Sequence, residues 1–367
     1  MKLLFLSKRR PQQRDLIERP YGRFHHLPRL LAARGHEVKV LLCSHHGLPE
    51  AQASLAGVDW TGLDLRTLGI RRFQQAMVQQ ASSFAPDWVI GCSDTWYGWL
   101  ASRLARRTGA LLAVDAYDNF EAYMPWNLPV HQLWRHAVRR ADLVTAAGPQ
   151  LAELLQSQRR SGPPVTVLPM AADPEFVPQD KAACRQALGL AVQATYVGYV
   201  GSWSASRGSS LLIDAFRQAR AARPDLQLLL SGRPPREVLD ESGVIATGYL
   251  PDAQLPMLLN ALDLACVVVA DTRFGRYSYP AKLCEAMACR IPVVATATEA
   301  VRWMLGGHAG HLAPLGDSQA FAERMLGLLE TPNVQYSPVQ TWEQVAPELE
   351  AQLLSIMRPG RSRGRAG

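Results

Sequence analysis

The sequence lacks long apolar runs and paired-cysteine motifs. Its longest apolar stretches, such as residues 265–270, are far shorter than the roughly 20 residues that a membrane-spanning helix needs, so we expect no such helix. Six cysteines are scattered without a Cys-x-x-Cys or Cys/His spacing: Cys43, Cys92, Cys184, Cys266, Cys284 and Cys289. This pattern predicts buried thiols in a reducing cytoplasm, with neither a disulfide framework nor a metal site.

Basic residues exceed acidic ones, and the formal net charge is +7. The basic residues gather in short groups: Lys8 to Arg10, Arg71-Arg72, Arg103 to Arg107, Arg135 to Arg140, Arg159-Arg160 and a tail from Arg358 to Arg365. Most of these groups fit solvated helix faces, and peripheral contact with anionic lipid headgroups at the inner face of the membrane stays open as an alternative. Nucleic acid is not an expected partner, because the groups are not interleaved with aromatic residues in a binding motif.

Apolar runs of strand length alternate with amphipathic segments along the chain, which predicts an α/β fold. The first residues, MKLLFLSKRR, have an apolar core too short for a signal peptide, so we interpret them as a first buried strand. At 367 residues the chain is long enough for two α/β domains, and an irregular connector with Pro174 and Pro178 separates them. We expect domains over 1–172 and 173–337, an amphipathic helix within 338–357 and a disordered basic tail over 358–367.

The segment from Asp271 to Thr296 has the pattern of a polar loop, a short helix and a buried strand. We expect the helix over 281–288, and its first N–H groups and the positive end of its dipole then point at the loop, as in anion sites. Lys282 and Glu285 lie on one face of this helix, where one can reach a phosphate and the other can accept hydrogen bonds from sugar hydroxyls. An exposed ion pair on an ordinary connection stays open as the alternative.

Glycines follow several predicted strands, at the edge where ligands bind in open α/β sheets. Gly22 lies where the chain enters the first helix, Gly201 follows the strand over 196–200, and Gly232 follows the strand over 226–230. The loop after Gly201 contains Arg207 and has phosphate-binding character, although it lacks the spacing of a P-loop or a dinucleotide motif. Tight turns and a solvent-exposed arginine are the alternative interpretations.

Three carboxylates follow the predicted strand over 111–114, namely Asp115, Asp118 and Glu121. They have no basic partner nearby in the sequence, so we interpret them as functional and not as packing residues. Capping of a following helix by Asp118 and Asn119 stays open as the alternative.

With these motifs in place, the chain resembles the retaining glycosyltransferases of family 4, which have the GT-B fold. Residues 280–294 match the family's donor-binding signature, Pro-x-Lys-x-x-Glu-x-x-Ala followed by Pro-Val-Val, and the segment YGRFHHLPRLLAARGHEV is similar to the family's opening helix. The resemblance implies two Rossmann-like domains that face each other across a cleft. The first is then the acceptor side, the second binds the nucleotide-sugar, and the C-terminal helix crosses back to the first.

The resemblance also implies roles for single residues. In this family the glutamate that matches Glu285 holds the ribose hydroxyls, and a basic pair after Gly201 neutralises the pyrophosphate. Arg207 matches the second residue of that pair, whereas Ser202 stands where an arginine is usual, and Tyr277 replaces a second family glutamate. The expected donor-binding residues are Gly22, Gly201, Arg207, Gly232, Tyr277, Ser278, Lys282 and Glu285.

The activity that the resemblance implies is transfer of a hexose, with retention, from a nucleotide-diphosphate sugar to a glycan or lipid-linked acceptor in cell-surface polysaccharide or glycolipid assembly. The sequence has no Asp-x-Asp pair and no His-Glu-x-x-His motif, so we expect no metal or other cofactor. Arg207 and Lys282 would stabilise the leaving diphosphate, and Asp115 or Asp118 stands where the family often carries a histidine near the reacting carbon. The resemblance therefore makes Asp115, Asp118, Arg207 and Lys282 the candidate catalytic residues. A sugar-nucleotide epimerase or hydrolase and a catalytically degenerate binding partner stay open. Donor turnover without an acceptor would indicate the first, and donor binding without transfer the second.

Overall fold

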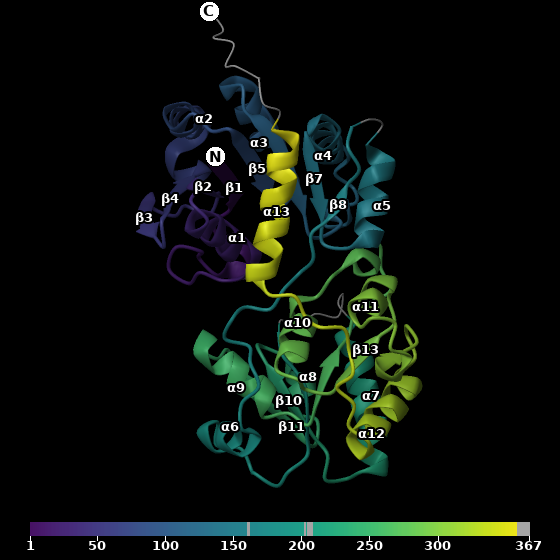
Figure 1. Cartoon of the computed structure of the whole chain (residues 1–367). Helices are drawn as coiled ribbons and strands as arrows, with labels where there is room; N and C mark the ends of the chain where they lie inside the picture. Colours follow the sequence, from purple (N-terminus) through teal and green to yellow (C-terminus); the bar gives the residue numbers. More distant parts are fainter. Residues whose placement is uncertain (160–161, 202, 204–207, 358–367) are drawn as a thin grey trace, which may run out of the picture. The chain divides into compact units, whose positions relative to one another are not determined.

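The computed structural model describes residues 1–159, 162–201, 203 and 208–357. It divides the chain into two compact units (Figure 1). Unit 1 comprises Met1–Pro169 and the chain from Thr341, and unit 2 comprises Met170–Gln340. The predicted boundaries, after residue 172 and before residue 338, lie a few residues from these limits. The predicted tail over 358–367 lies outside the described residues.

Unit 1 is built on a sheet with the strand order β3-β4-β2-β1-β5-β6-β7-β8. Neighbouring strands run parallel, and β3 pairs antiparallel with β4 at one edge. The strands are β1 Lys2–Lys8, β2 Glu37–Ser44, β3 Ala51–Leu55, β4 Val58–Asp64, β5 Trp88–Cys92, β6 Leu111–Ala116, β7 Leu143–Ala146 and β8 Thr166–Val167. Strand β1 is buried over its central residues, which confirms that the first residues form a core strand.

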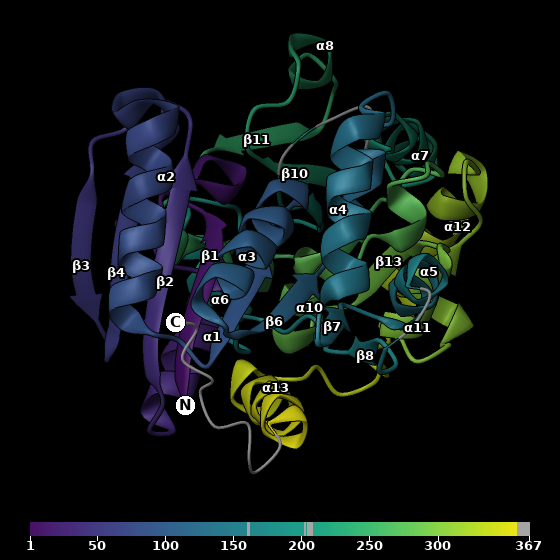
Figure 2. The same cartoon turned by 90° about the horizontal axis from the view of Figure 1, so that it is seen from above.

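The helices of unit 1 fall into two groups. Helices α2, α3, α4 and α5 form a row in which each packs against the next, whereas α1 packs against α13 (Figure 2). The helices are α1 Gly22–Ala33, α2 Leu65–Phe84, α3 Thr95–Thr108, α4 Leu128–Arg140, α5 Pro149–Gln158 and α13 Trp342–Ile356, with short 3-10 turns η1 Pro11–Gln13 and η2 Phe120–Ala122. This arrangement follows from right-handed crossovers, which place helices on opposite faces when the strand order reverses.

Helix α13 holds the end of the described chain on unit 1. Trp342, Val345, Leu349 and Leu353 are buried on one stripe of this helix, at helical spacing. Full burial of a large apolar side chain stabilises by about 1.5–3 kcal/mol, so this stripe alone contributes several kcal/mol to docking. Glu350 adds an ion pair with Arg34 at 2.5 Å and a 2.6 Å contact with His36 Nε2, both just after the end of α1. The prediction that the last helix returns to the first domain is confirmed.

Unit 2 has a parallel sheet in the order β11-β10-β9-β12-β13-β14. The strands are β9 Tyr196–Tyr199, β10 Gln227–Ser231, β11 Val244–Gly248, β12 Leu264–Val267, β13 Val293–Thr296 and β14 Leu312–Ala313. The helices are α6 Lys181–Ala187, α7 Ser209–Ala222, α8 Arg236–Leu239, α9 Leu255–Asn260, α10 Ala281–Ala288, α11 Glu299–Met304 and α12 Ser318–Glu330, with turns η4 Asp252–Gln254, η5 Gly275–Tyr277 and η6 Ala309–His311. The order is that of a doubly wound, Rossmann-like sheet.

The core of unit 2 lies on both faces of its sheet. Along β10, Leu228 and Leu230 join one apolar cluster, with α7 and α12, while Leu229 joins the other, with α9 and α10. Successive strand residues point to opposite faces, which is why a continuous apolar run can supply both clusters. All six cysteines of the chain are buried and free, so the prediction of buried thiols is confirmed.

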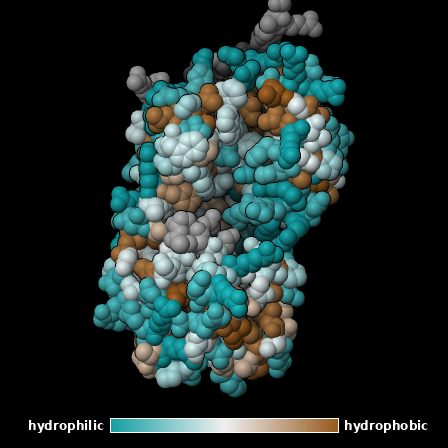
Figure 3. Space-filling view, turned by 180° about the vertical axis from the view of Figure 1, so that it is seen from behind, coloured by the Kyte–Doolittle hydropathy of each residue, from teal (hydrophilic) through white to brown (hydrophobic). Residues whose placement is uncertain are grey.

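The surface shows no membrane-crossing element in the described part of the chain. None of the helices there combines the length and the apolar character that a bilayer span requires. On the face shown in Figure 3, hydrophilic residues cover most of the surface and apolar residues form separate patches.

Candidate functional site

The strand order of unit 2 creates a switch point between β9 and β12. The chain builds outward from β9 in one direction through β10 and β11, and from β12 in the other through β13 and β14. Connections on the two sides of such a point diverge, and they leave a crevice at the carboxyl ends of the strands where ligands bind. Gly201 follows β9, and the loop from Val268 to Pro280 follows β12 and leads into α10. The predicted donor-binding residues Gly201 and Lys282 therefore come from the two segments that flank this point.

Two glycines allow the backbone to pack closely at this edge. The Gly201 amide donates to Ser231 Oγ at 2.8 Å, and the Gly232 amide donates to the Gly248 carbonyl at 2.8 Å. Both glycines have positive φ, at +134° and +83°. A Cβ on Gly232 would lie 3.0 Å from the Gly201 carbonyl oxygen, and a Cβ on Gly201 would lie 3.0 Å from Lys282 Nζ. Side chains at these positions would be strained and would crowd the lysine.

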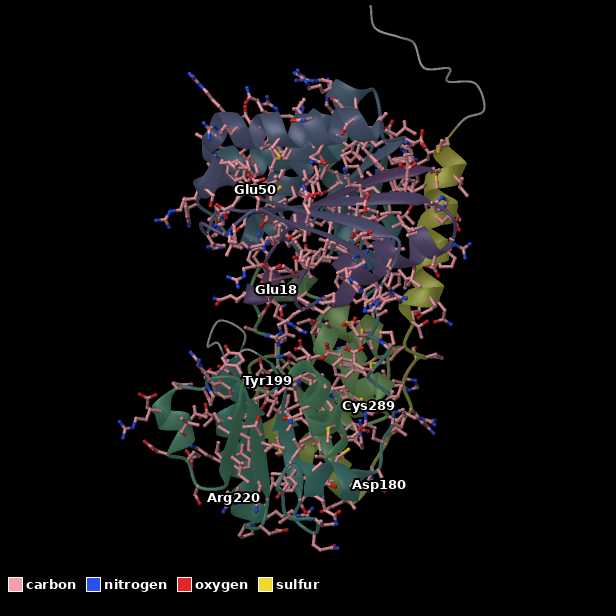
Figure 4. All side chains as sticks on the ribbon, turned by 90° about the vertical axis from the view of Figure 1, so that its left-hand side faces the viewer. Glu18, Glu50, Asp180, Tyr199, Arg220 and Cys289 are labelled. Carbon is pink, nitrogen blue, oxygen red and sulfur yellow. The ribbon has the colours of Figure 1, made fainter. Side chains whose placement is uncertain are left out.

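Lys282 places its ammonium at the same edge. It lies in the first turn of α10, and Nζ is 3.7 Å from the centroid of the Tyr199 ring. Tyr199, labelled in Figure 4, is fully buried at the end of β9. Its ring anchors this cation–π contact. The lysine itself is half-buried, so its ammonium group stays at the edge of the sheet. A fixed ammonium beside the first N–H groups of a helix is suited to binding a phosphate.

The remaining predicted donor-side residues lie in the loop before α10 and in α10 itself. Tyr277 ends the turn η5, Ser278 follows it directly, and half-buried Glu285 lies one turn after Lys282. The loop is tightly folded, because a Cβ on Gly275 would lie only 2.0 Å from the Ala270 carbonyl oxygen. The contacts of Tyr277, Ser278 and Glu285 with a sugar or ribose stay predictions. Arg207 and Ser202 lie outside the described residues.

In unit 1, Asp115 forms a buried, bidentate ion pair. Arg23 Nε donates to Asp115 Oδ2 at 2.7 Å and Arg23 Nη2 donates to Oδ1 at 2.6 Å, while the Thr145 hydroxyl donates to Oδ1 at 2.5 Å. Arg23 Nη1 also donates to the carbonyls of Leu168 and Pro169, at 3.0 Å each. Arg23 directly follows Gly22, which begins α1 with a φ of +62°. The pair thus ties the start of α1 to β6 and to the end of the sheet.

The three carboxylates after β6 have no basic partner nearby in the sequence, but the fold gives two of them distant basic partners. Asp115 pairs with Arg23, and Glu121, which is fully buried, accepts from Arg135 at 2.7 and 2.8 Å. Arg23 lies 92 residues from Asp115, and Arg135 lies in α4, 14 residues from Glu121, so the neighbouring sequence reveals neither partner. Asp118 is half-buried and accepts from the Tyr123 hydroxyl at 2.9 Å. It is the more accessible of the two candidate catalytic aspartates.

Sequence reasoning missed the end of β5, which lies beside β1 at the switch point of unit 1. Ser93 is buried there with a φ of +95°, a strained value for a non-glycine residue and one that is common near functional sites. Asp94 caps α3 by accepting from the Trp96 amide at 3.2 Å, and burial raises its carboxyl pKa. Burial likewise raises the pKa of the Tyr117 hydroxyl, which lies near Asp94, Asp118 and Ser93. An aspartate between an apolar strand and an amphipathic helix was the available signal.

No metal cluster occurs within the described ranges, where three or more His, Cys, Asp or Glu side chains nowhere converge as a ligand set. The absence of a metal or other cofactor from the reaction stays a prediction.

Each of the two units carries a doubly wound sheet, and the second holds a candidate phosphate site at its switch point. Together these features define a protein of the GT-B class. Both halves match family models. Residues 22–171 match the model described as glycosyl transferase 4-like domain, and residues 194–331 match the model described as glycosyl transferases group 1. The chain belongs to glycosyltransferase family 4, as its donor-binding signature predicted.

Individual relatives show the extent of the similarity. The phosphatidyl-myo-inositol mannosyltransferase of Mycobacterium leprae is 35% identical over 130 residues, which are 34% of this chain and 34% of that protein. The match spans about a third of the length of such curated relatives. Sucrose-phosphate synthase of Thermosynechococcus elongatus shares the fold with a TM-score of 0.74 at 18% identity, over 97% of both chains. Anabaena HepE in complex with UDP has a TM-score of 0.69 at 18% identity, again over 97% of both chains.

Proposed function

We propose that this protein is a retaining glycosyltransferase that moves a hexose from a nucleotide-diphosphate sugar to an acceptor hydroxyl in cell-surface polysaccharide or glycolipid assembly. The observation that carries the proposal is the Lys282 ammonium, held against Tyr199 and Gly201 at the switch point of unit 2. The UDP complex of HepE and the phosphatidyl-inositol acceptor in the name of the M. leprae relative support it. The buried, free cysteines support a cytoplasmic site of action.

The proposed chemistry depends on the leaving group. Departure of a nucleoside diphosphate builds negative charge on the β-phosphate, and Lys282 together with the first N–H groups of α10 would stabilise that charge. Glu285, one turn further along α10, would accept hydrogen bonds from the ribose hydroxyls, and Arg207 would be a second cation for the diphosphate. The β-phosphate oxygen would take the proton from the attacking acceptor hydroxyl on the same face as it departs, which gives retention. No metal is required in this scheme.

Unit 1 would supply the acceptor side. Asp118 and Asp94 lie at the carboxyl ends of β6 and β5, where polar groups could orient an acceptor hydroxyl. Asp115 would act indirectly, because its carboxylate is committed to Arg23 and holds the start of α1 in place.

The first test is a thermal-shift screen of the whole chain with UDP, GDP, ADP and dTDP and their common sugars, with magnesium and with a chelator. A ligand that binds only the folded state raises its apparent stability, so we expect a shift with one base, independent of metal. Sugar transfer to an acceptor is then measured with that donor, and Glu285→Ala should lose most of it while the fold survives.

Other outcomes of this test separate the alternatives. Donor turnover at full rate without any acceptor would indicate an epimerase or hydrolase and contradict the transferase proposal. Donor binding with no turnover would indicate a degenerate partner. A strict requirement for magnesium would contradict the metal-independent scheme.

A further inference from the structure

Helices α2 and α3 of unit 1 lie side by side (Figure 2). Residues of both helices line a groove of about 540 Å³. Arginines dominate its polar lining, with two glutamine amides beside them: Arg71, Arg103, Arg106, Arg107, Gln74 and Gln75. All four arginines are exposed, so their charges are available to a ligand.

The arginines of this groove form no ion pair in the part of the chain that the structure describes. Neither α2 nor α3 contains an aspartate or glutamate. Within the described ranges, no carboxylate comes within ion-pair distance of the four groove arginines. One of them, Arg103, is positioned by a cation–π contact, with Cζ 5.1 Å from the Trp99 ring centroid. Uncompensated arginines that converge on one groove repel each other and favour a bound anion, and their planar forks match phosphate oxygens.

Exposed apolar side chains lie near the first turns of both helices. Ile70, one helical turn before Gln74, is 66% exposed, and Trp96, one turn before Trp99, is 43% exposed. The Trp96 and Trp99 rings meet edge to face at 6.2 Å. Helices α2 and α3 follow β4 and β5, so both exposed residues lie toward the carboxyl edge of the sheet. Large apolar side chains beside arginines are typical of the interface between water and lipid, where indole rings and guanidinium groups both bind well.

We propose that the α2–α3 groove binds the phosphate headgroups of anionic lipids at a membrane surface, while Ile70 and Trp96 enter the boundary between headgroups and acyl chains. A soluble phosphate would use the arginines and leave Ile70 and Trp96 in water, whereas a bilayer engages both. The proposal rests on this groove and not on the donor site, so it stands independently of the proposed transferase activity.

Membrane contact at this position would serve a lipid-linked acceptor. Asp94, the cap of α3, lies two residues before Trp96, at the same edge of the sheet as the candidate acceptor residues. A bilayer that touches Trp96 would therefore present its headgroups near the end of β5.

The test is co-sedimentation of the whole chain with vesicles of phosphatidylcholine alone or with about a quarter phosphatidylglycerol. We expect binding to the anionic vesicles only. Each arginine near an anionic surface strengthens binding by about fivefold, so the double variant Arg71→Gln with Arg103→Gln should bind about 30-fold more weakly. The matched control is Arg236→Gln with Arg324→Gln, which removes the same charge from exposed helical positions of unit 2. Thermal midpoints report whether each variant is folded.

A second variant separates a bilayer from a soluble anion. Ile70→Ser keeps all charges and should weaken vesicle binding by about tenfold, because it removes an apolar side chain from the boundary. The proposal is overturned if the groove variant binds as the wild type does, or if the unit 2 control loses as much. It is also overturned if Ile70→Ser has no effect, or if millimolar inorganic phosphate abolishes vesicle binding by occupying the groove.

Discussion

Replacing Lys282 by glutamine tests whether the switch point of unit 2 binds a diphosphate. The change removes one positive charge and keeps a polar side chain of similar length. Lys282 Nζ lies against the Tyr199 ring at 3.7 Å and within 3.0 Å of where a Gly201 Cβ would stand, so its direction is fixed by the fold. Hydrogen bonds to charged groups contribute about 1.5–3 kcal/mol, and 1.4 kcal/mol is a factor of ten. We expect the Kd for the preferred nucleoside diphosphate to rise about 10- to 100-fold.

Calorimetry with the nucleoside diphosphate and with its parent nucleoside measures this effect. The loss should appear with the diphosphate and not with the nucleoside, because only the former has phosphate oxygens for the ammonium to contact. Lys181→Gln is the matched control, since Lys181 is the other lysine of unit 2 and forms a surface ion pair with Asp263. An unchanged diphosphate Kd in Lys282→Gln, or an equal loss for the nucleoside, would refute the assignment.

Three further predictions follow from the geometry. Gly201→Ala should weaken diphosphate binding about tenfold in the same calorimetry, because its Cβ would crowd Lys282 Nζ at a φ of +134°; an unchanged Kd would contradict this. Arg23→Met should lower the free energy of unfolding by about 3–5 kcal/mol, since it leaves Asp115 buried without its partner; denaturant unfolding with an unchanged midpoint would contradict the structural role. Burial raises the pKa of Asp64, but backbone amide hydrogen bonds outweigh it and lower the pKa to about 2 from 3.8. That carboxylate therefore stabilises the fold by about 2 kcal/mol above pH 4, and the contribution is lost as the pH falls toward 2. Asp64→Asn should flatten the acid limb of the stability profile, and an unchanged limb would count against it.

Local sequence patterns predicted the elements whose signals are local. Helix α10 begins and ends where expected, because Pro280 precedes it and a polar loop and an apolar strand flank it. The last helix was predicted from its apolar stripe. Helix α2 was missed, although Phe73, Met77, Ala81 and Phe84 follow a helical period, because Gly69 interrupts its first turns with a φ of +72°. The missed helix forms one wall of the α2–α3 groove.

The roles of the carboxylates after β6 depended on residues far along the chain. Arg23 and Asp115 are 92 residues apart, and a search for nearby basic residues finds no link between them. The fold brings them together because α1 starts at the same edge of the sheet at which β6 ends.

The sequence by itself determined the α/β alternation, the positions of the turn glycines and the signature around Lys282 and Glu285, since these depend on the periodicity and conformational range of neighbouring residues. Only the tertiary structure decided which loops meet. The order of parallel strands is set by crossovers between distant segments, and this order places Gly201, Gly232 and Lys282 at one edge and joins Arg23 to Asp115. It also aligns α2 with α3, which turns two separate basic segments into one groove.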